Sequence, residues 1–333
     1  MALLSITMPT RNRPELFERA LSSVLSGCAA VSEHVEVTVS DGSDQRTTGE
    51  LAKRLLTDWP GGYRYVWNSP ALSLTDNLNR AMELASGEWI HQLHDDDYLL
   101  PGAGARMCQA LQASGPDASV LLFGVDVVDA EGKRRRRQAF HRERYLEPPV
   151  ALRRLLRNSS FVRHPGIVIH RRALDETGVF DPAMAVPIDV DLWVRLFSRY
   201  GVRCVPHVVS AYTVHDAALT TGMWHPDTIR VFGEIFDRAA GMGVVPEDKI
   251  RRWQADFLSQ FILAGAYRRL RPGRRAEAGE VLRLFDLPAV AQLGVSVKWL
   301  PVRVAFTAVA RPHSRLRDPS GCGAWVDRSS ESP

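Results

Sequence analysis

The stretch SLTDNLNRAMELASGEWIHQLHDDD (Ser73–Asp97) carries the pattern that decides the fold. Its first half repeats apolar residues at helical spacing as far as Ala85, and Ser73 is suited to capping that helix. Gly87 ends the helical pattern, and EWIHQL (Glu88–Leu93) has the composition of a buried strand. The stretch therefore predicts a helix and then a strand, with an acidic cluster at the carboxyl end of that strand.

The same alternation of strand and helix begins near the N-terminus. Three further apolar runs have the composition of short strands: Leu3–Met8, Val35–Val39 and Tyr63–Trp67. Amphipathic stretches at residues 14–25 and Thr48–Leu56 separate them. This repetition predicts an α/β fold with a parallel, right-handed, doubly wound sheet. Ligands bind at the carboxyl ends of the strands in such sheets, and SDGSD (Ser40–Asp44) and His94–Asp97 both fall at these ends.

After about residue 118 the pattern changes. We expect a strand, a turn at Glu131-Gly132 and a return strand, followed by a strand that leads into a helix at His164–Leu174. A helix is predicted at Asp189–Phe197 and a strand at Val202–His215. Beyond Pro226 the chain becomes helical. Its apolar residues form two stripes, which are Val231, Phe232, Ile235 and Phe236, and then Ile250, Trp253, Phe257 and Phe261.

The composition excludes several classes of protein. The 333 residues carry a formal net charge of +4, and 45% of them are hydrophobic, as in an ordinary globular protein. Residues 133–154 hold nine Lys/Arg against two Glu, so the basicity is local and a fully basic nucleic-acid binder is disfavoured. The four cysteines are scattered singly, which argues against a zinc ribbon or a disulfide framework. Since the N-terminus lacks the pattern of a signal peptide, we expect a cytoplasmic protein.

Three consecutive aspartates, Asp95 to Asp97, repel one another unless a cation neutralises them. Carboxylates suit hard cations such as Mg2+ and Mn2+, which usually also hold phosphate oxygens. Taken alone, the cluster fits a metal and diphosphate site or a solvated loop equally well. Asp41 and Asp44 suit a tight turn, but their position at a strand end, with the acidic run downstream, favours a ligand site.

Six segments, in order along the chain, resemble family 2 glycosyltransferases with the GT-A fold. They are Ser5–Leu25, Val37–Asp44, Leu74–Ala103, His164–Pro182, Asp189–Leu196 and Ala211–His215. The resemblance implies a Rossmann-like, mostly parallel central sheet in a catalytic domain of residues 1–225. A nucleotide-sugar-binding half (1–117) would precede an acceptor-binding half (118–225). Residues 226–311 resemble nothing we can name and are expected to form a helical C-terminal region, with a disordered tail at 312–333.

The resemblance implies a donor site at the strand ends. It assigns eight residues to the donor: Pro9, Thr10, Arg13, Asp41, Asn77, Arg80, Asp95 and Asp97. Asp41 would bind the base, because a carboxylate accepts a hydrogen bond from a uracil-type N–H. Ser40 stands where many members have a first aspartate. For Asn77 and Arg80 an exposed helix face is the alternative, since they share their spacing with Glu83.

The resemblance also implies a metal site for Mn2+ or Mg2+. The alignment places His94 at the position of the first aspartate of the usual motif and makes Asp96 the best metal ligand. His215 resembles a histidine that reaches back to the metal or the diphosphate, with a surface residue as the alternative. The metal ion held there would neutralise the departing diphosphate.

The catalytic base implied by the resemblance is Asp189, with Asp191 as the runner-up. Two aspartates that cap a helix near its positive end are compatible with either choice. His164, which precedes a predicted strand, is a weaker candidate for the acceptor side.

We therefore predict an inverting, metal-assisted transfer of a sugar from a nucleotide diphosphate donor to a hydroxyl or amine acceptor. The acceptor is open among a glycan, a lipid-linked carrier, a protein and a natural product. A non-catalytic sugar-nucleotide-binding protein of the same fold is the alternative, and nucleic acid is not expected as a partner. The apolar stripes of residues 226–311 need a partner surface. We expect packing within the chain or in a homodimer, ahead of peripheral membrane contact through Val295–Phe306.

Overall fold

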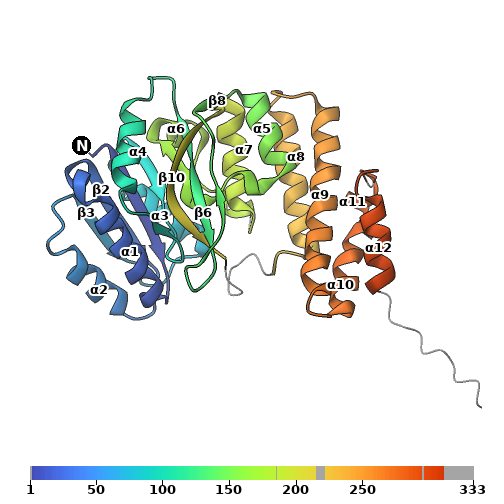
Figure 1. The fold of residues 1–333 in the computed structure, drawn as a ribbon, viewed down its shortest axis with the longest axis horizontal. Coiled ribbons are helices and arrows are strands. Elements are labelled where there is room, and N and C mark those ends of the chain that lie inside the picture. The colour runs from blue at the N-terminus through green and yellow to red at the C-terminus, as the bar shows by residue number, and fades with distance from the viewer. Residues whose placement is uncertain (1, 185, 215–221, 295, 311–333) are drawn as a thin grey trace, which may run out of the picture.

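The computed structural model describes residues 2–184, 186–214, 222–294 and 296–310. A ten-stranded sheet runs through the body, and the last helices form a separate layer at one end of it (Figure 1). The first part of the sheet is wholly parallel, in the order β3-β2-β1-β4. Its strands are β1 (Leu4–Thr10), β2 (Val35–Asp41), β3 (Tyr63–Trp67) and β4 (Trp89–Gln92). The predicted parallel arrangement of the first hundred residues is therefore confirmed.

The second part of the sheet mixes parallel and antiparallel pairs and continues as β4-β9-β6-β10-β5. Its strands are β5 (Tyr98–Leu99), β6 (Val120–Val128), β7 (Arg134–Gln138), β8 (Arg144–Leu146), β9 (Ile167–His170) and β10 (Val202–Thr213). β9 is antiparallel to both β4 and β6, whereas β10 is parallel to β6. The hairpin of β6 and β7 forms as predicted, but the two-residue β5 was not predicted.

Helices cover both faces of this sheet. The helices of the body are α1 (Pro14–Cys28), α2 (Thr47–Leu56), α3 (Leu74–Glu83), α4 (Ala103–Gln112), α5 (Pro148–Arg157), α6 (Arg171–Thr177) and α7 (Ile188–Tyr200). Short 3-10 turns join some elements, at Ala29–His34, Ser159–Phe161, His164–Gly166 and Pro182–Met184. Because side chains alternate along a strand, Leu121 packs with α1, α2 and α4, whereas Leu122 packs with α3, α5 and α7. The α/β fold class is confirmed.

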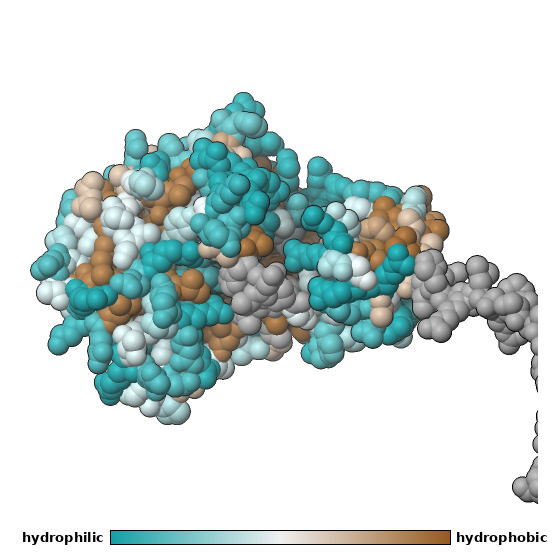
Figure 2. All heavy atoms as spheres, turned by 60° about the horizontal axis from the view of Figure 1, so that its bottom comes forward, coloured by the Kyte–Doolittle hydropathy of each residue, from teal (hydrophilic) through white to brown (hydrophobic). Residues whose placement is uncertain are grey.

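The C-terminal helices share a core with α5 and α7. They are α8 (Pro226–Gly241), α9 (Glu247–Leu270), α10 (Arg275–Leu282), α11 (Pro288–Ala291) and α12 (Leu300–Ala310), with a 3-10 turn at Arg283–Asp286. The two predicted stripes pack against each other, since the ring of Phe232 meets Phe257 and Phe261 edge-on, with centroid distances of 4.8 and 5.2 Å. On the face shown in Figure 2, apolar surface gathers at the C-terminal end of the body. Among the helices that the structure describes, none is both long and apolar enough to cross a bilayer.

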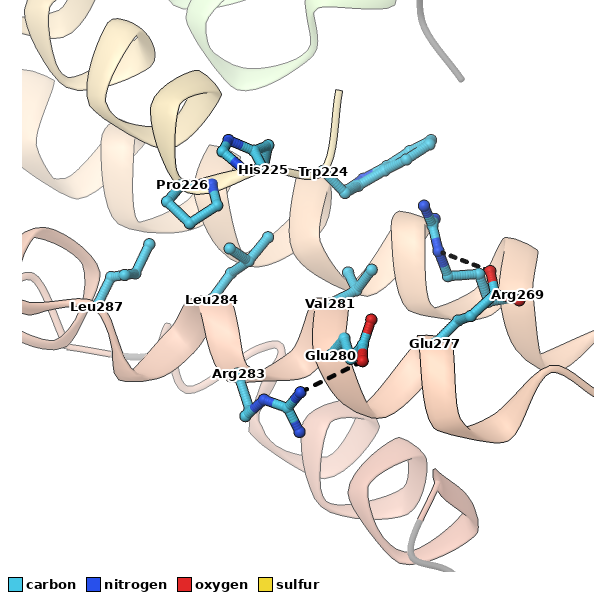
Figure 3. Close-up of a pocket in the computed structure, with 10 residues that line it drawn as sticks. All are labelled: Trp224, His225, Pro226, Arg269, Glu277, Glu280, Val281, Arg283, Leu284 and Leu287. Carbon is cyan, nitrogen blue, oxygen red and sulfur yellow. Dashed lines mark ion pairs between the residues drawn. The ribbon is translucent and has the colours of Figure 1, made fainter. Parts of the chain in front are cut away.

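A hollow of about 430 Å³ lies between the start of α8 and α10 (Figure 3). Its charged side chains pair with one another or with close neighbours, as in Arg269 with Glu277 at 3.8 Å. Trp224 closes one end, and its indole N–H donates to the carbonyl oxygen of Phe261 at 2.9 Å. A Cβ at Gly265 would lie 2.2 Å from the indole, so only glycine allows this contact. We interpret the hollow as a packing feature that anchors the start of α8.

Candidate donor and metal site

The carboxyl end of β2 is fixed by a buried carboxylate. Asp41 is fully buried, and its Oδ1 accepts from the backbone N–H of Ser43 at 2.8 Å. Its Oδ2 accepts from the Tyr65 hydroxyl at 2.5 Å. Burial and the Asp41 carboxylate raise the pKa of Tyr65, which therefore stays protonated as the donor. Each carboxylate oxygen has two lone pairs, so Asp41 retains acceptor capacity at the predicted base-binding position.

The side-chain amide of Asn77 ties α3 to the ends of β1 and β2. Its Nδ2 donates to the carbonyl oxygen of Thr10 at 3.1 Å, and its Oδ1 accepts from the Ser40 hydroxyl at 2.7 Å. Pro9 lies opposite Ser40 in the register of β1 and β2. Asn77 is thus buried and holds the ends of the two strands together, and its contact with the donor stays a prediction. The exposed-face alternative fits Arg80, because its guanidinium is half exposed and pairs with Glu83 at 3.2 Å.

The acidic loop between β4 and β5 packs against the start of α1. The Thr10 hydroxyl donates to Asp95 Oδ2 at 2.9 Å, and the Arg13 guanidinium lies 3.2 Å from Asp95 Oδ1. The same guanidinium lies 3.7 Å from Asp96 Oδ2. Burial, with the neighbouring Asp96 charge, raises the pKa of Asp95 despite Arg13. The structure therefore brings three predicted donor residues together with the predicted metal ligand.

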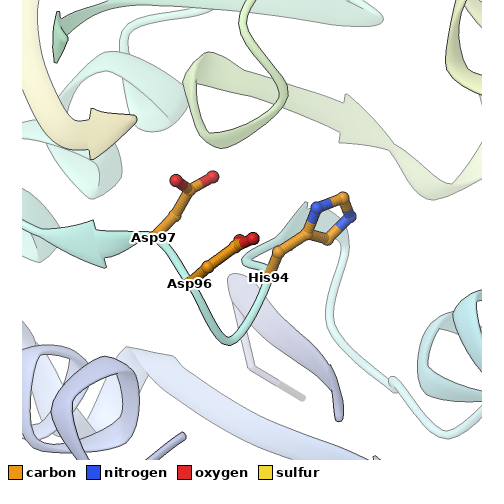
Figure 4. A group of neighbouring side chains, drawn as sticks. All are labelled: His94, Asp96 and Asp97. Carbon is orange, nitrogen blue, oxygen red and sulfur yellow. The ribbon is translucent and has the colours of Figure 1, made fainter. Parts of the chain in front are cut away.

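Three side chains of this loop form a group with the ligand atoms of a metal site. One ligand atom each from His94, Asp96 and Asp97 lies within 4.8 Å of the others (Figure 4). Burial lowers the pKa of His94, so its ring is neutral, and Nε2 has no hydrogen-bond partner among the described residues. Asp97 is fixed by the backbone N–H of Thr213 in β10, at 2.8 Å. A nitrogen lone pair and two carboxylates fit a divalent cation. The predicted ligand His215 lies outside the described residues.

A second histidine, His164, packs against the His94 ring of this group. The ring of His164 stacks on His94 with a centroid distance of 4.1 Å and faces Phe180 and Trp193 at 6.1 and 6.3 Å. Desolvation lowers the pKa of His164 well below its usual value. The acceptor-side candidate of the sequence is therefore a buried, neutral ring behind His94. No local pattern indicated this contact between residues so far apart in the sequence.

Asp189 lies in the first turn of α7. Its Oδ1 accepts from the backbone N–H of Val190 at 2.8 Å. Burial raises the pKa of Asp189 to about 6, and the nearby Arg163 charge opposes this rise. A carboxylate with such a pKa is a stronger base than usual and is still ionised at neutral pH.

Tyr212 and Arg163 lie near Asp189, and sequence reasoning missed both. The Arg163 guanidinium lies 4.8 Å from the centre of the Tyr212 ring. Burial raises the pKa of the Tyr212 hydroxyl, and the charges of Asp97, Asp189 and Asp96 add to this rise. Tyr212 is thus within electrostatic reach of both Asp189 and the acidic loop, and its neighbour Thr213 donates to Asp97 at 2.8 Å. Tyr212 belongs to the motif AYTVH, which was the available signal for it.

Asp191 occupies a different environment from Asp189. Its side chain is fully buried, with Oδ2 at 3.0 Å from Arg195 Nε and Oδ1 at 2.8 Å from an Arg238 nitrogen. Arg195 also donates to the carbonyl oxygens of Gly178 and Val179 at the end of α6, at 3.0 and 2.7 Å. The carboxylate thus joins α7 to α6 and α8. This position favours a structural role for the runner-up.

Asp191→Ala is expected to lower the free energy of unfolding by roughly 3–5 kcal/mol, because it removes the counter-charge of the buried Arg195 guanidinium and one of the two carboxylates that pair with Arg238. Asp248→Ala is the matched control, since Asp248 is 66% exposed and pairs with Arg252 on the outside of α9. It should cost at most about 1 kcal/mol. Urea unfolding followed by circular dichroism measures both. Equal losses in the two variants would contradict the structural role.

Comparisons with known proteins identify the family. Residues 5–178 match Glycosyl transferase family 2. An uncharacterised protein of Mycobacterium tuberculosis is 31% identical over 231 residues, which are 66% of this chain and 69% of that protein. The GalNAc(5)-diNAcBac-PP-undecaprenol beta-1,3-glucosyltransferase of Campylobacter jejuni is 28% identical over 132 residues, which are 40% of each chain.

Solved structures show the same fold. TarS 1-349 of S. aureus in complex with UDP-GlcNAc has a TM-score of 0.65 at 17% identity, covering 93% of this chain and 88% of that one. The mannosyltransferase PcManGT of Pyrobaculum calidifontis, in complex with GDP-Man and Mn2+, has a TM-score of 0.54 at 16% identity, covering 92% and 85%. Since the family match spans more than half of its residues, the chain belongs to glycosyl transferase family 2 and is a glycosyltransferase of the GT-A fold.

Proposed function

We propose that this glycosyltransferase moves a sugar from a nucleotide diphosphate donor to a hydroxyl or amine acceptor and inverts the anomeric centre. The observation that carries the proposal is the link through β10: the Tyr212 ring lies against Arg163, whose charge acts on Asp189, and the next residue, Thr213, donates to Asp97 of the group of His94, Asp96 and Asp97. Transfer with inversion needs two catalytic groups. A base takes the proton of the acceptor, and a positive charge stabilises the leaving group. Neighbours of the same fold bind UDP-GlcNAc and GDP-Man, which supports a donor of this class.

The donor would lie across the ends of β1, β2 and β4. Asp41 would accept from the base N–H with its remaining lone pairs, next to Pro9 and Thr10. Arg13 would meet the diphosphate, because its guanidinium already lies beside Asp95 at the edge of the acidic loop. Asp95, fixed by Thr10 and Arg13, would accept from a ribose or sugar hydroxyl.

His94, Asp96 and Asp97 would hold a divalent cation, and His215 would complete the set. A nitrogen ligand favours Mn2+ over Mg2+, because Mg2+ prefers oxygen ligands and retains its water. The mannosyltransferase of the same fold was solved with Mn2+, which supports this choice. When bound, the cation would offset the negative charge that develops on the departing diphosphate.

Asp189 would take the proton of the acceptor group as that group attacks the anomeric carbon. The hydrogen bond from the Val190 N–H fixes Oδ1 and therefore orients the carboxylate. The Arg163 guanidinium, which lies on the Tyr212 ring, would hold that side chain in place beside the base. His164 would act through His94, because its ring stacks on that residue within the buried part of the site.

A thermal-shift panel tests this function. UDP-, GDP- and dTDP-sugars are each measured with Mn2+, with Mg2+ and with a chelator. At 100 times its Kd, a donor stabilises the folded state by about 2.7 kcal/mol, so one donor should raise Tm with Mn2+ and do so less with the chelator.

Donor hydrolysis in the same samples separates the two functions. Stabilisation with slow release of nucleoside diphosphate supports the transferase. Stabilisation without any turnover would support the non-catalytic sugar-nucleotide-binding protein instead. If no donor shifts Tm with either metal, the proposed donor class is wrong.

A further inference from the structure

The outward face of α12 is apolar along its whole length. Five exposed residues at helical spacing form this face: Pro301, Val304, Ala305, Ala308 and Val309. Val304 is 61% exposed and Val309 is 50% exposed. The opposite side of the helix, with Val302 and Phe306, packs against the C-terminal core. A helix that is apolar on both sides is normally covered on both, and here none of the described residues covers the outward side.

The apolar face continues beyond the start of the helix. Val297 is 85% exposed and Leu300 is 48% exposed, next to Lys298 and Trp299. We call Val297, Leu300, Val304, Ala305, Ala308 and Val309 the α12 surface. It lies at the C-terminal end of the body, where Figure 2 shows apolar side chains gathered. This end of the body is separate from the strand ends that form the donor site (Figure 1).

Unpaired cations adjoin the start of this surface. A hollow of about 360 Å³ is lined by Arg153, Arg154 and Arg157 of α5 together with Lys298 and Trp299. The three arginines project outward on one side of α5, whose other side is buried. Within the described residues, none of the three makes an ion pair. Asp256 is the single acidic residue of the lining, so positive charge dominates the hollow.

We propose that the α12 surface and the cations of this hollow dock the protein on an anionic lipid bilayer. The apolar side chains would enter the headgroup region, while Arg153, Arg154, Arg157 and Lys298 would meet lipid phosphates. Trp299 lies between the two parts, and a tryptophan beside cations suits the membrane interface.

Charge favours a bilayer over a second copy of the chain as the cover for this surface. A second copy that met the α12 surface with its own α12 surface would cover the apolar side chains, but that surface carries no acidic residue to meet the arginines of the hollow. An anionic bilayer instead supplies both an apolar layer and the opposite charge. The proposal does not rest on the transfer reaction, because no residue of the donor site takes part in it.

Vesicle flotation of the full chain tests the proposal. The protein is expected to float with vesicles that contain phosphatidylglycerol, to float poorly with pure phosphatidylcholine, and to be released as salt is raised. Val304→Glu should lower the floated fraction by about tenfold, because it places a charge in the apolar layer. Met242→Glu is the matched control, since it adds the same charge at a position on the end of α8 that is 40% exposed.

Arg153→Glu with Arg154→Glu tests the cations without changing α12 and should also lower flotation. Circular dichroism confirms that each variant folds. Flotation that is absent in the parent chain, or unchanged in both the α12 and the arginine variants, would overturn the proposal. Light scattering measures whether the chain is a monomer or a dimer in solution. A dimer that Val304→Glu converts to a monomer would assign the α12 surface to a second copy and would also overturn it.

Discussion

Asp96→Ala is expected to abolish the metal-dependent part of donor binding and to leave the fold intact. Asp96 lies in the exposed part of the acidic loop, with 21% of its side chain accessible, whereas Asp95 is 8% accessible. Without Asp96, the group keeps His94 and Asp97, and one oxygen of Asp97 already accepts from the Thr213 N–H. Even with His215 in the set, two nitrogens and a partly used carboxylate suit a hard cation poorly, because such a cation prefers oxygen ligands.

Calorimetry of a UDP-type ligand, with and without Mn2+, measures this effect. The variant with Mn2+ should bind the ligand as weakly as the parent chain does with a chelator. Asp237→Ala is the matched control, because Asp237 is 61% exposed and pairs with Arg251 at 2.5 Å away from the strand ends. Binding by Asp96→Ala that equals the parent with Mn2+ would remove Asp96 from the metal site.

Local sequence patterns were sufficient for much of the fold. The Ser73 hydroxyl accepts from the Asp76 N–H at 3.1 Å, as its predicted capping position requires. The rule that ligands bind where parallel strands end placed the acidic cluster with Asp95 at that edge of the sheet, and its carboxylate accepts from the Thr10 hydroxyl at the end of β1, 85 residues away. These features depend on the composition of one element or on a general property of the sheet.

Contacts between distant elements could not be predicted in the same way. The two-residue β5 forms because it pairs with β10, and the Asp97 carboxylate accepts from the Thr213 N–H of that strand. The stacking of His94 on His164 likewise depends on how β4 meets the turn before β9. Nothing within either segment indicates the partner, so a sequence pattern carries no signal for such pairs.

The choice between two aspartates shows the same limit. Asp189 and Asp191 both lie in the first turn of α7. A negative charge is favourable there because of the helix dipole, whether or not the residue is also the base. Only the three-dimensional structure distinguishes their roles. Arg195 and Arg238 pair with Asp191, whereas Asp189 lies near Tyr212. Arg238 comes from α8, a region for which the sequence offered no family resemblance.

Asp189→Asn is expected to lower the transfer rate by roughly two to four orders of magnitude, because an amide of nearly the same shape cannot accept the proton of the acceptor. Donor affinity should stay close to that of the parent chain, since Asp189 belongs to α7 and the donor residues lie at the ends of β1, β2 and β4. Steady-state transfer and calorimetric donor binding measure the two quantities separately.

The pH dependence gives a second readout of the same residue. Burial favours the neutral form of Asp189 and raises its pKa to about 6, so the base is protonated and inactive below this pH. The rate of the parent chain should therefore rise as pH increases through about 6 and then level off. The residual rate of Asp189→Asn should lack this rise. A variant Asp191→Asn that folds but has lost transfer, beside an active Asp189→Asn, would show that Asp191 is the base. An unchanged pH profile in Asp189→Asn would likewise exclude Asp189.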